Sequence, residues 1–288
     1  MASESYRPGI WRLRFRAAGV RNAAALALLS LMGCGPAPSE PDGLSGLRPY
    51  DRITLAHDGS DGGDATLGGY YAAVLHGFFL QEGLDVTLVQ PARPEGSALA
   101  MVAAGGADYG VADADRILIA RARGQEVVGL LAPVQTGLAE LTDAPDPATD
   151  FAEETEWDPY GRVLLTGADR IGERPDQVAR MARAAARGWR RYIEDPEATH
   201  AYMRSKREAL DEDRLIADHR ALVPRVNNAE ARIHGIGTMR AERWADLHRR
   251  LKDADQLGPE PGDPESAFNA SFVPGPPDEA DLLLNFGR

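Results

Sequence analysis

Apolar positions along residues 52–134 follow two alternating patterns. Apolar runs of strand length alternate with stretches in which apolar residues recur every three or four positions, the period of a helix. Glycines follow these helical stretches, where a left-handed residue commonly ends a helix, and Ser97 is placed to cap one of them. The predicted strands are residues 52–57, 85–90, 109–112 and 127–134, and the predicted helices are residues 67–82, 97–104 and 113–123. Strands that alternate with helices predict a parallel α/β sheet.

The alternation stops after residue 134. Residues 138–158 contain eight acidic residues, no basic residues and two prolines, which predicts a solvated loop. A fifth strand is predicted at residues 162–166. The predicted helices that follow are residues 175–194, 196–208, 211–222 and 240–254, and the proline-rich residues 258–277 predict an irregular wrap or tail.

The first 33 residues have the pattern of an export signal. Five arginines precede a short apolar run, and the motif Leu31-Met32-Gly33-Cys34 follows it. This motif is similar to a lipobox, in which a lipid is attached to the cysteine and the chain is cut before it. The alternative is a buried or unpaired cysteine in an amphipathic helix. We expect a lipoprotein signal peptide at residues 1–33, lipidation of Cys34, and a proline-rich tether at residues 34–49.

The charge balance and the single cysteine restrict the possible partners. The formal net charge is -12, and residues beyond 33 carry 27 basic and 43 acidic side chains. Because such a body repels phosphate backbones, we do not expect nucleic acid as a partner. One cysteine excludes an internal disulfide and a cysteine-based zinc site, and the six histidines lack ligand-like spacing. We therefore expect no metal and no cofactor.

Short motifs along the chain resemble one protein family, in the family's own order. The longest, residues 69–86, reads GYYAAVLHGFFLQEGLDV. It is similar to a signature of the solute-binding proteins of ABC importers, of the sulfonate, nitrate and thiamine-precursor (thiamine-pyrimidine-synthase-like) type. The remaining matches are residues 104–111 (AGGADYGV), 120–124 (ARARG), 173–178 (ERPDQV), 186–189 (ARGW) and 194–198 (EDPEA). The resemblance implies a periplasmic-binding-protein-like α/β lobe followed by C-terminal helices.

The sequence departs from that family in length. The family has two lobes, and the second is inserted after the fourth strand of the first. Here 27 residues separate Val134 from Arg162, whereas a domain needs about 50 or more. We expect one solute-binding-like domain at residues 50–255, with the second lobe reduced or absent, and a C-terminal tail at residues 256–288.

Candidate ligand contacts follow from the predicted topology. Ligands of open α/β sheets bind beyond the C-terminal ends of the strands, where helix N-termini offer N–H groups. An anion would meet at least three carboxylates in these loops and one base, Arg116, whereas Tyr70 can offer an aromatic face. We therefore expect a neutral or cationic heterocycle rather than a sulfonate or nitrate. For each residue the alternative is a cap, a turn or a solvated side chain. The expected contacts are His57, Asp58, Gly59, Tyr70, Asp113, Asp115 and Gln135.

An enzyme relative of this family, the fungal thiamine-pyrimidine synthase, provides a test for catalysis. Its pyridoxal-phosphate lysine and a nearby histidine correspond here to Ala112 and Arg116. Its cysteine-rich iron motif corresponds to residues 157–160, which read WDPY. These reactive groups are missing, so we do not expect an enzyme.

Two functions are consistent with the resemblance. The first is an exported, lipid-anchored solute-binding protein on the periplasmic or cell-surface side of a bacterial membrane. It would deliver a small organic molecule, such as a thiamine-precursor-like heterocycle, to an ABC permease. The second is a degenerate single-lobe relative that acts as a binding or protein-interaction module without a transport role, with a partner or a second copy, as a homodimer, covering the exposed end of the sheet.

Overall fold

The computed structural model describes residues 50–59, 65–91, 97–136 and 159–276, which belong to one compact unit. The expected signal peptide, Cys34, the tether and the acidic segment 138–158 lie outside these residues. Within the described ranges, no helix is both long and apolar enough to cross a membrane.

All five strands of the described chain form one sheet, in the order β2-β1-β3-β5-β4. The strands are β1 (Asp51–His57), β2 (Leu84–Val89), β3 (Tyr109–Ala112), β4 (Val127–Leu131) and β5 (Val163–Gly167). Strands β2 and β3 run parallel to β1, whereas β5 is antiparallel to both of its neighbours.

The antiparallel β5 corrects the expectation of an all-parallel sheet. The chain leaves the C-terminal end of β4 and begins β5 beside it. The N–H of Gly161 donates there to the carbonyl of Val134 at 2.9 Å. A strand that starts where its neighbour ends must run the opposite way. The apolar pattern of residues 162–166 predicts a buried strand but carries no information on its direction.

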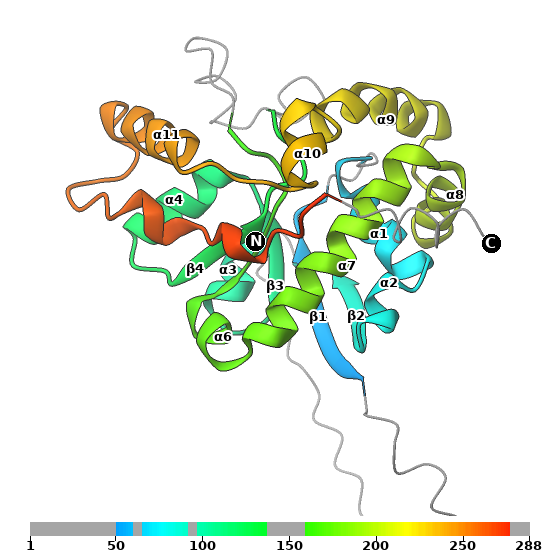
Figure 1. Ribbon diagram of the computed structural model, residues 1–288, viewed down its shortest axis with the longest axis horizontal. Coiled ribbons are helices and arrows are strands. Elements are labelled where there is room, and N and C mark those ends of the chain that lie inside the picture. The colour runs from blue at the N-terminus through cyan, green and yellow to red at the C-terminus, as the bar shows by residue number, and fades with distance from the viewer. Residues whose placement is uncertain (1–49, 60–64, 92–96, 137–158, 277–288) are drawn as a thin grey trace, which may run out of the picture. The chain divides into compact units, whose positions relative to one another are not determined.

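A hydrophobic core lies on each face of the sheet. Along β5, Leu164 belongs to one core, whereas Val163 and Leu165 belong to the other, because successive strand residues point to opposite faces. The Leu164 face carries η1 (Ala65–Leu67), α1 (Gly68–Leu75), α2 (Phe78–Gln81), α6 (Ala168–Glu173), α7 (Pro175–Glu194), α8 (Glu197–Lys206), α9 (Glu212–Val226) and α10 (Ala229–His234). The other face carries α3 (Ala98–Ala103), α4 (Ala114–Ala122) and α11 (Ala241–Asp253). Figure 1 shows α7 lying across the near side of the sheet, with α1 and α2 beside it.

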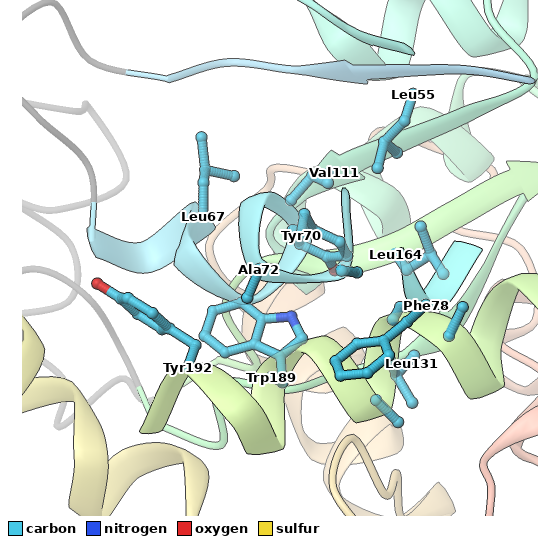
Figure 2. Close-up of a cluster of buried hydrophobic side chains, with 14 of the residues drawn as sticks. Leu55, Leu67, Tyr70, Ala72, Phe78, Val111, Leu131, Leu164, Trp189 and Tyr192 are labelled. Carbon is cyan, nitrogen blue, oxygen red and sulfur yellow. The ribbon is translucent and has the colours of Figure 1, made fainter. Parts of the chain in front are cut away.

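Glycines bring α1 and α7 into very close contact. A Cβ atom at Gly69 would lie 2.1 Å from the Trp189 ring, and one at Gly188 would lie 2.2 Å from the carbonyl oxygen of Gly69. Trp189 is fully buried, and its ring meets that of Tyr70 edge-on with centroids 5.6 Å apart. Figure 2 shows the indole between α7 and α1, close to Tyr70 and Ala72. The family motifs at residues 69–86 and 186–189 therefore meet in the core.

The helices of the structure differ from the predicted helices in three places. The helix expected at residues 67–82 is interrupted at Gly77, which has the left-handed φ of 68°. The short helices α6 and α10 were not expected. The cap at Ser97 is confirmed, since its hydroxyl accepts from the N–H of Ala100 at 3.1 Å.

The described part of the proline-rich C-terminal segment packs against the domain. It contains the short 3-10 helices η3 (Pro264–Ala267) and η4 (Ala270–Phe272). The Phe268 ring stacks on Trp244, with centroids 5.1 Å apart, and Phe268 bridges to Gly129 of β4. Residues 264–272 thus lie against the edge strand of the sheet.

Candidate functional site

The C-terminal ends of β1, β3 and β4 share one edge of the sheet, and antiparallel β5 begins there. We call this the C-terminal edge. Helix α4 begins directly after β3, and η1 leads into α1 after β1. In open α/β sheets this is the edge at which ligands bind, because helix N-termini and strand ends converge on it.

Hydrogen bonds hold the residues at the end of β1 and directly after it. His57 is buried, its Nδ1 accepts from the N–H of Gly59 at 3.3 Å, and its Nε2 lies 3.4 Å from the Tyr71 hydroxyl. The carboxylate of Asp58 accepts from the N–H of Ala98 at 2.7 Å, at the start of α3. Asp58 therefore satisfies a helix N-terminus, as the alternative interpretation of this acid predicted.

Arg162, immediately before β5, joins two of the expected residues. Its N–H donates to the carboxylate of Asp113 at 2.8 Å, and its carbonyl accepts from the Tyr70 hydroxyl at 2.9 Å. Its Nε donates to the hydroxyl of Thr66 at 2.7 Å. The structure thus brings Tyr70 and Asp113 together through the backbone of one residue, and adds Thr66 and Arg162 to the candidate site.

The position of Arg162 corrects one premise of the sequence prediction. Arg116 was expected to be the one base at this edge, and this favoured a neutral or cationic ligand. Arg162 was assigned to the predicted strand, but it precedes β5 and its φ is 53°, in the left-handed region. The sequence gives no signal for this backbone conformation, because most left-handed residues are glycine or asparagine.

The other expected contacts, Asp115 and Gln135, are buried and bonded to nearby backbone. Asp115 is 4% exposed and accepts from the N–H of Arg116 at 2.8 Å. Gln135 is 2% exposed, and its side-chain amide donates to the carbonyls of Ala132 at 2.6 Å and Thr238 at 2.9 Å. Gln135 therefore ties the end of β4 to the segment between α10 and α11.

The aromatic side chains divide between the core and this edge. Tyr70 is 1% exposed, and burial raises the pKa of its hydroxyl. Tyr71, the next residue, is half-buried and packs edge-on against His57 and against Tyr202 of α8, with centroids 5.9 and 6.3 Å apart. Successive helical residues point about 100° apart, so Tyr70 and Tyr71 face different sides of α1. The sequence pattern did not show which of the two would face the C-terminal edge.

A pocket of about 400 Å³ lies at the opposite edge of the sheet, and none of the expected ligand contacts lines it. Asp108 accepts there from the N–H of Thr54 at 2.8 Å and pairs with Arg170, which also donates to Gln177 at 2.7 Å. Arg180 holds the pKa of Asp51, in the same lining, below its usual range. These bonds connect β1, β3, α6 and α7, which gives the aspartate of the motif at residues 104–111 a structural role.

Among the residues that the structure describes, no group of three or more histidine, cysteine, aspartate or glutamate side chains is arranged to hold a metal ion.

Comparison with known proteins identifies the fold. Residues 65–150 match the model of the NMT1/THI5-like family. No curated protein sequence matches the chain. Among solved structures, the periplasmic aliphatic sulphonate binding protein SsuA from Escherichia coli is 12% identical, with a TM-score of 0.53 over 80% of this chain and 96% of its own.

Two further structures are similar. A Candida albicans protein with the generic periplasmic binding protein fold is 12% identical, with a TM-score of 0.55 over 81% of this chain and 100% of its own. A putative periplasmic sulfonate-binding protein SsuA from Methylobacillus flagellatus is 14% identical, with a TM-score of 0.52 over 83% of this chain and 96% of its own. The chain therefore has the periplasmic-binding-protein fold, and the match over residues 65–150 supports its resemblance to the NMT1/THI5-like family.

Proposed function

We propose that this chain is the solute-binding component of an ABC importer, exported and anchored to a bacterial membrane through a lipid on Cys34. The solute is a small organic molecule bound at the C-terminal edge, and thiamine-precursor-like heterocycles are among the candidates. The observation that carries the proposal is the combination of the family match over residues 65–150 with the shared fold. Two of the similar structures are named as sulfonate-binding proteins, and none of those compared above is named as an enzyme.

The proposed binding residues are those that meet at the C-terminal edge. They come from the ends of β1, β3 and β4 and from the start of α1, and Thr66 and Arg162 extend the set predicted from sequence. We place His57, Asp58, Gly59, Tyr70, Asp113, Asp115 and Gln135 at or directly beneath the ligand.

A thermal-shift screen tests solute binding. Thiamine precursors, flavins, sulfonates and amino-acid-like compounds are added to the full chain, because a ligand that binds only the folded state must raise the melting temperature. The strongest compound is then titrated by calorimetry against wild type and Asp113→Asn. Asp169→Asn, at the opposite edge, is the matched control. Equal affinity of wild type and Asp113→Asn would place the ligand elsewhere.

The lipid anchor has its own test. Replacing Cys34 with serine removes the thiol that would carry the lipid, so we expect the protein to move from the membrane fraction to the soluble fraction. A Cys34→Ser variant that stays in the membrane fraction would show that another segment holds it there.

The second candidate is a single-lobe module that binds another protein or a second copy of itself. It is favoured by the single sheet that the described residues form. Light scattering coupled to size-exclusion chromatography decides between the two: a stable dimer that binds no compound in the screen supports this module, whereas a monomer with a bound solute supports the first proposal.

A further inference from the structure

The pocket of about 400 Å³ described above lies where β1 and β3 begin and β5 ends, and we call it the N-terminal pocket. Its walls come from the first residues of β1, the turn between α3 and β3, and the junction of α6 and α7. Its volume is that of a small-molecule site, which is typically about 300–1,000 Å³. The seven-residue strand β1 runs from Asp51 in this pocket to His57 at the C-terminal edge, so the two places are about 20 Å apart.

The inner charges of the N-terminal pocket are already paired. Asp108 pairs with Arg170, whose guanidinium lies over the Tyr109 ring, 5.4 Å from its centroid. Asp51 pairs with Arg180 at 2.9 Å. Partly buried charges that are satisfied in this way form a fixed floor, and they do not need a ligand to complete their bonding.

Three charged side chains at the rim of the pocket differ from these. Arg52, Glu173 and Arg174 line the pocket and are exposed, and none of them forms an ion pair or a side-chain hydrogen bond within the described residues. Arg174 also acts on the floor: beyond the hydrogen bond from Arg180, its charge holds the pKa of Asp51 below its usual range. Two guanidinium groups and one carboxylate with unused bonding capacity thus border a single cavity.

The balance of charge indicates what kind of molecule fits. The lining contains four acidic and three basic side chains. Because Arg180, outside the lining, pairs with one of the acids, the pocket has no net charge that would attract a simple anion or a simple cation. A molecule with both charges can use both kinds of group, since a carboxylate accepts from guanidinium forks and an ammonium group donates to Glu173. Buried apolar side chains form part of the wall, namely Ile53, Val102 and Ala107.

We propose that the N-terminal pocket binds a small zwitterion, namely a free α-amino acid. Arg52 and Arg174 hold its carboxylate, and Glu173 holds its ammonium group. This is a second ligand site, separate from the C-terminal edge, and it does not depend on the solute-binding function proposed above. An amino acid bound there connects β1 to the α6–α7 junction and stabilises the folded state.

The test compares matched probes on the full chain by calorimetry. 2-Aminopentanoate carries both charged groups, whereas pentanoate carries only the carboxylate and pentylamine only the ammonium group. Affinities are measured for wild type, Arg174→Gln and Glu173→Gln. Arg123→Gln is the matched control, because Arg123 is an exposed arginine after α4 that does not line the pocket. The three substituted side chains are exposed, so the variants should keep the fold, and melting temperatures without ligand verify this.

We expect wild type to bind 2-aminopentanoate at least about tenfold more tightly than pentanoate or pentylamine, because each of these lacks one charge-assisted contact. Arg174→Gln and Glu173→Gln should each weaken the binding of 2-aminopentanoate by a similar factor. Arg123→Gln should match wild type.

Two results would overturn this site. One is a wild type that binds 2-aminopentanoate no more tightly than pentanoate and pentylamine, and the other is equal affinity of wild type and either pocket variant. Binding that is lost in Asp113→Asn but kept in both pocket variants would place the amino acid at the C-terminal edge, so that solute binding stands and the N-terminal site falls. A loss confined to Arg174→Gln and Glu173→Gln supports the N-terminal site, whatever the thermal-shift screen finds for the C-terminal edge.

Discussion

Adding one methyl group at Gly188 should separate the two helices that carry the main core. A Cβ atom there would lie 2.2 Å from the carbonyl oxygen of Gly69 and 2.6 Å from Cβ of Ala73. Carbon–oxygen contacts tolerate about 3.3 Å, so α7 must move away from α1 by on the order of 1 Å. Neither neighbour can rotate aside, because one is backbone and the other is a methyl group fixed to backbone.

The magnitude follows from two opposing effects. Overpacking a tight core costs about 1–3 kcal/mol, and this site belongs at the upper end because backbone atoms are involved. Alanine also improves helix propensity over glycine by about 1 kcal/mol. The Gly188→Ala variant should therefore lose about 2 kcal/mol of unfolding free energy, which is a fall of roughly 4–8 °C in melting temperature for a domain of this size.

The matched control is Gly172→Ala in α6, where a Cβ atom would meet nothing within 4 Å. Helix propensity acts alone there, so this variant should gain up to about 1 kcal/mol. Urea denaturation followed by circular dichroism measures both changes. If Gly188→Ala is as stable as wild type while Gly172→Ala behaves as expected, the close approach of α1 and α7 is not the constraint described here.

Two further predictions concern the core and its titration. Burial lowers the pKa of both His200 and His219, whose rings lie 5.7 Å apart beside Tyr192, and charge repulsion from His219 lowers that of His200 further. The nearby Glu212 raises the pKa of His200 and Arg220 lowers that of His219, but burial is the largest effect for each. Because the unfolded chain binds protons more readily, with an ordinary pKa of about 6.5, the unfolding free energy should fall as pH drops below about 6.5. Urea melts at pH 7 and pH 5 should show this loss, and His200→Gln should reduce it; an equal loss in the variant would contradict the assignment. Tyr70→Phe removes the hydroxyl that donates to the carbonyl of Arg162, which should cost about 1 kcal/mol of unfolding free energy; an unchanged urea midpoint would mean that this bond contributes nothing.

The sequence predicted the fold well because its family motifs are architectural. Gly69 and Gly188 permit the α1–α7 contact, and Pro175 occupies the first turn of α7, where a missing N–H costs nothing. Asp108 connects β1 and β3 at the edge away from the expected ligand. The contacts that these motif residues make are distant in sequence, but the motifs occur in the order of the family, so the resemblance predicted the fold that brings them together.

The candidate site was less predictable because its geometry depends on long-range contacts. Thr66 and Arg162 are 96 positions apart, and Arg162 and Asp113 are 49 positions apart. A left-handed arginine resembles any other arginine in a sequence, so neither its conformation nor its neighbours could be inferred. The hydroxyl of Tyr70 reaches this edge, but its ring is buried in the core against Trp189, which lies on another helix.

Because β5 begins beside the end of β4, the length of the chain between these two strands can vary without a change in the sheet. The segment between β4 and β5 begins and ends at adjacent points, clamped by the bond between Gly161 and Val134. Closing a longer segment between fixed neighbouring ends costs little more than closing a short one, because the entropic cost grows only with the logarithm of length. We therefore expect that residues can be inserted there while the register of the five strands stays the same. This junction is therefore the place to graft a foreign domain onto the protein.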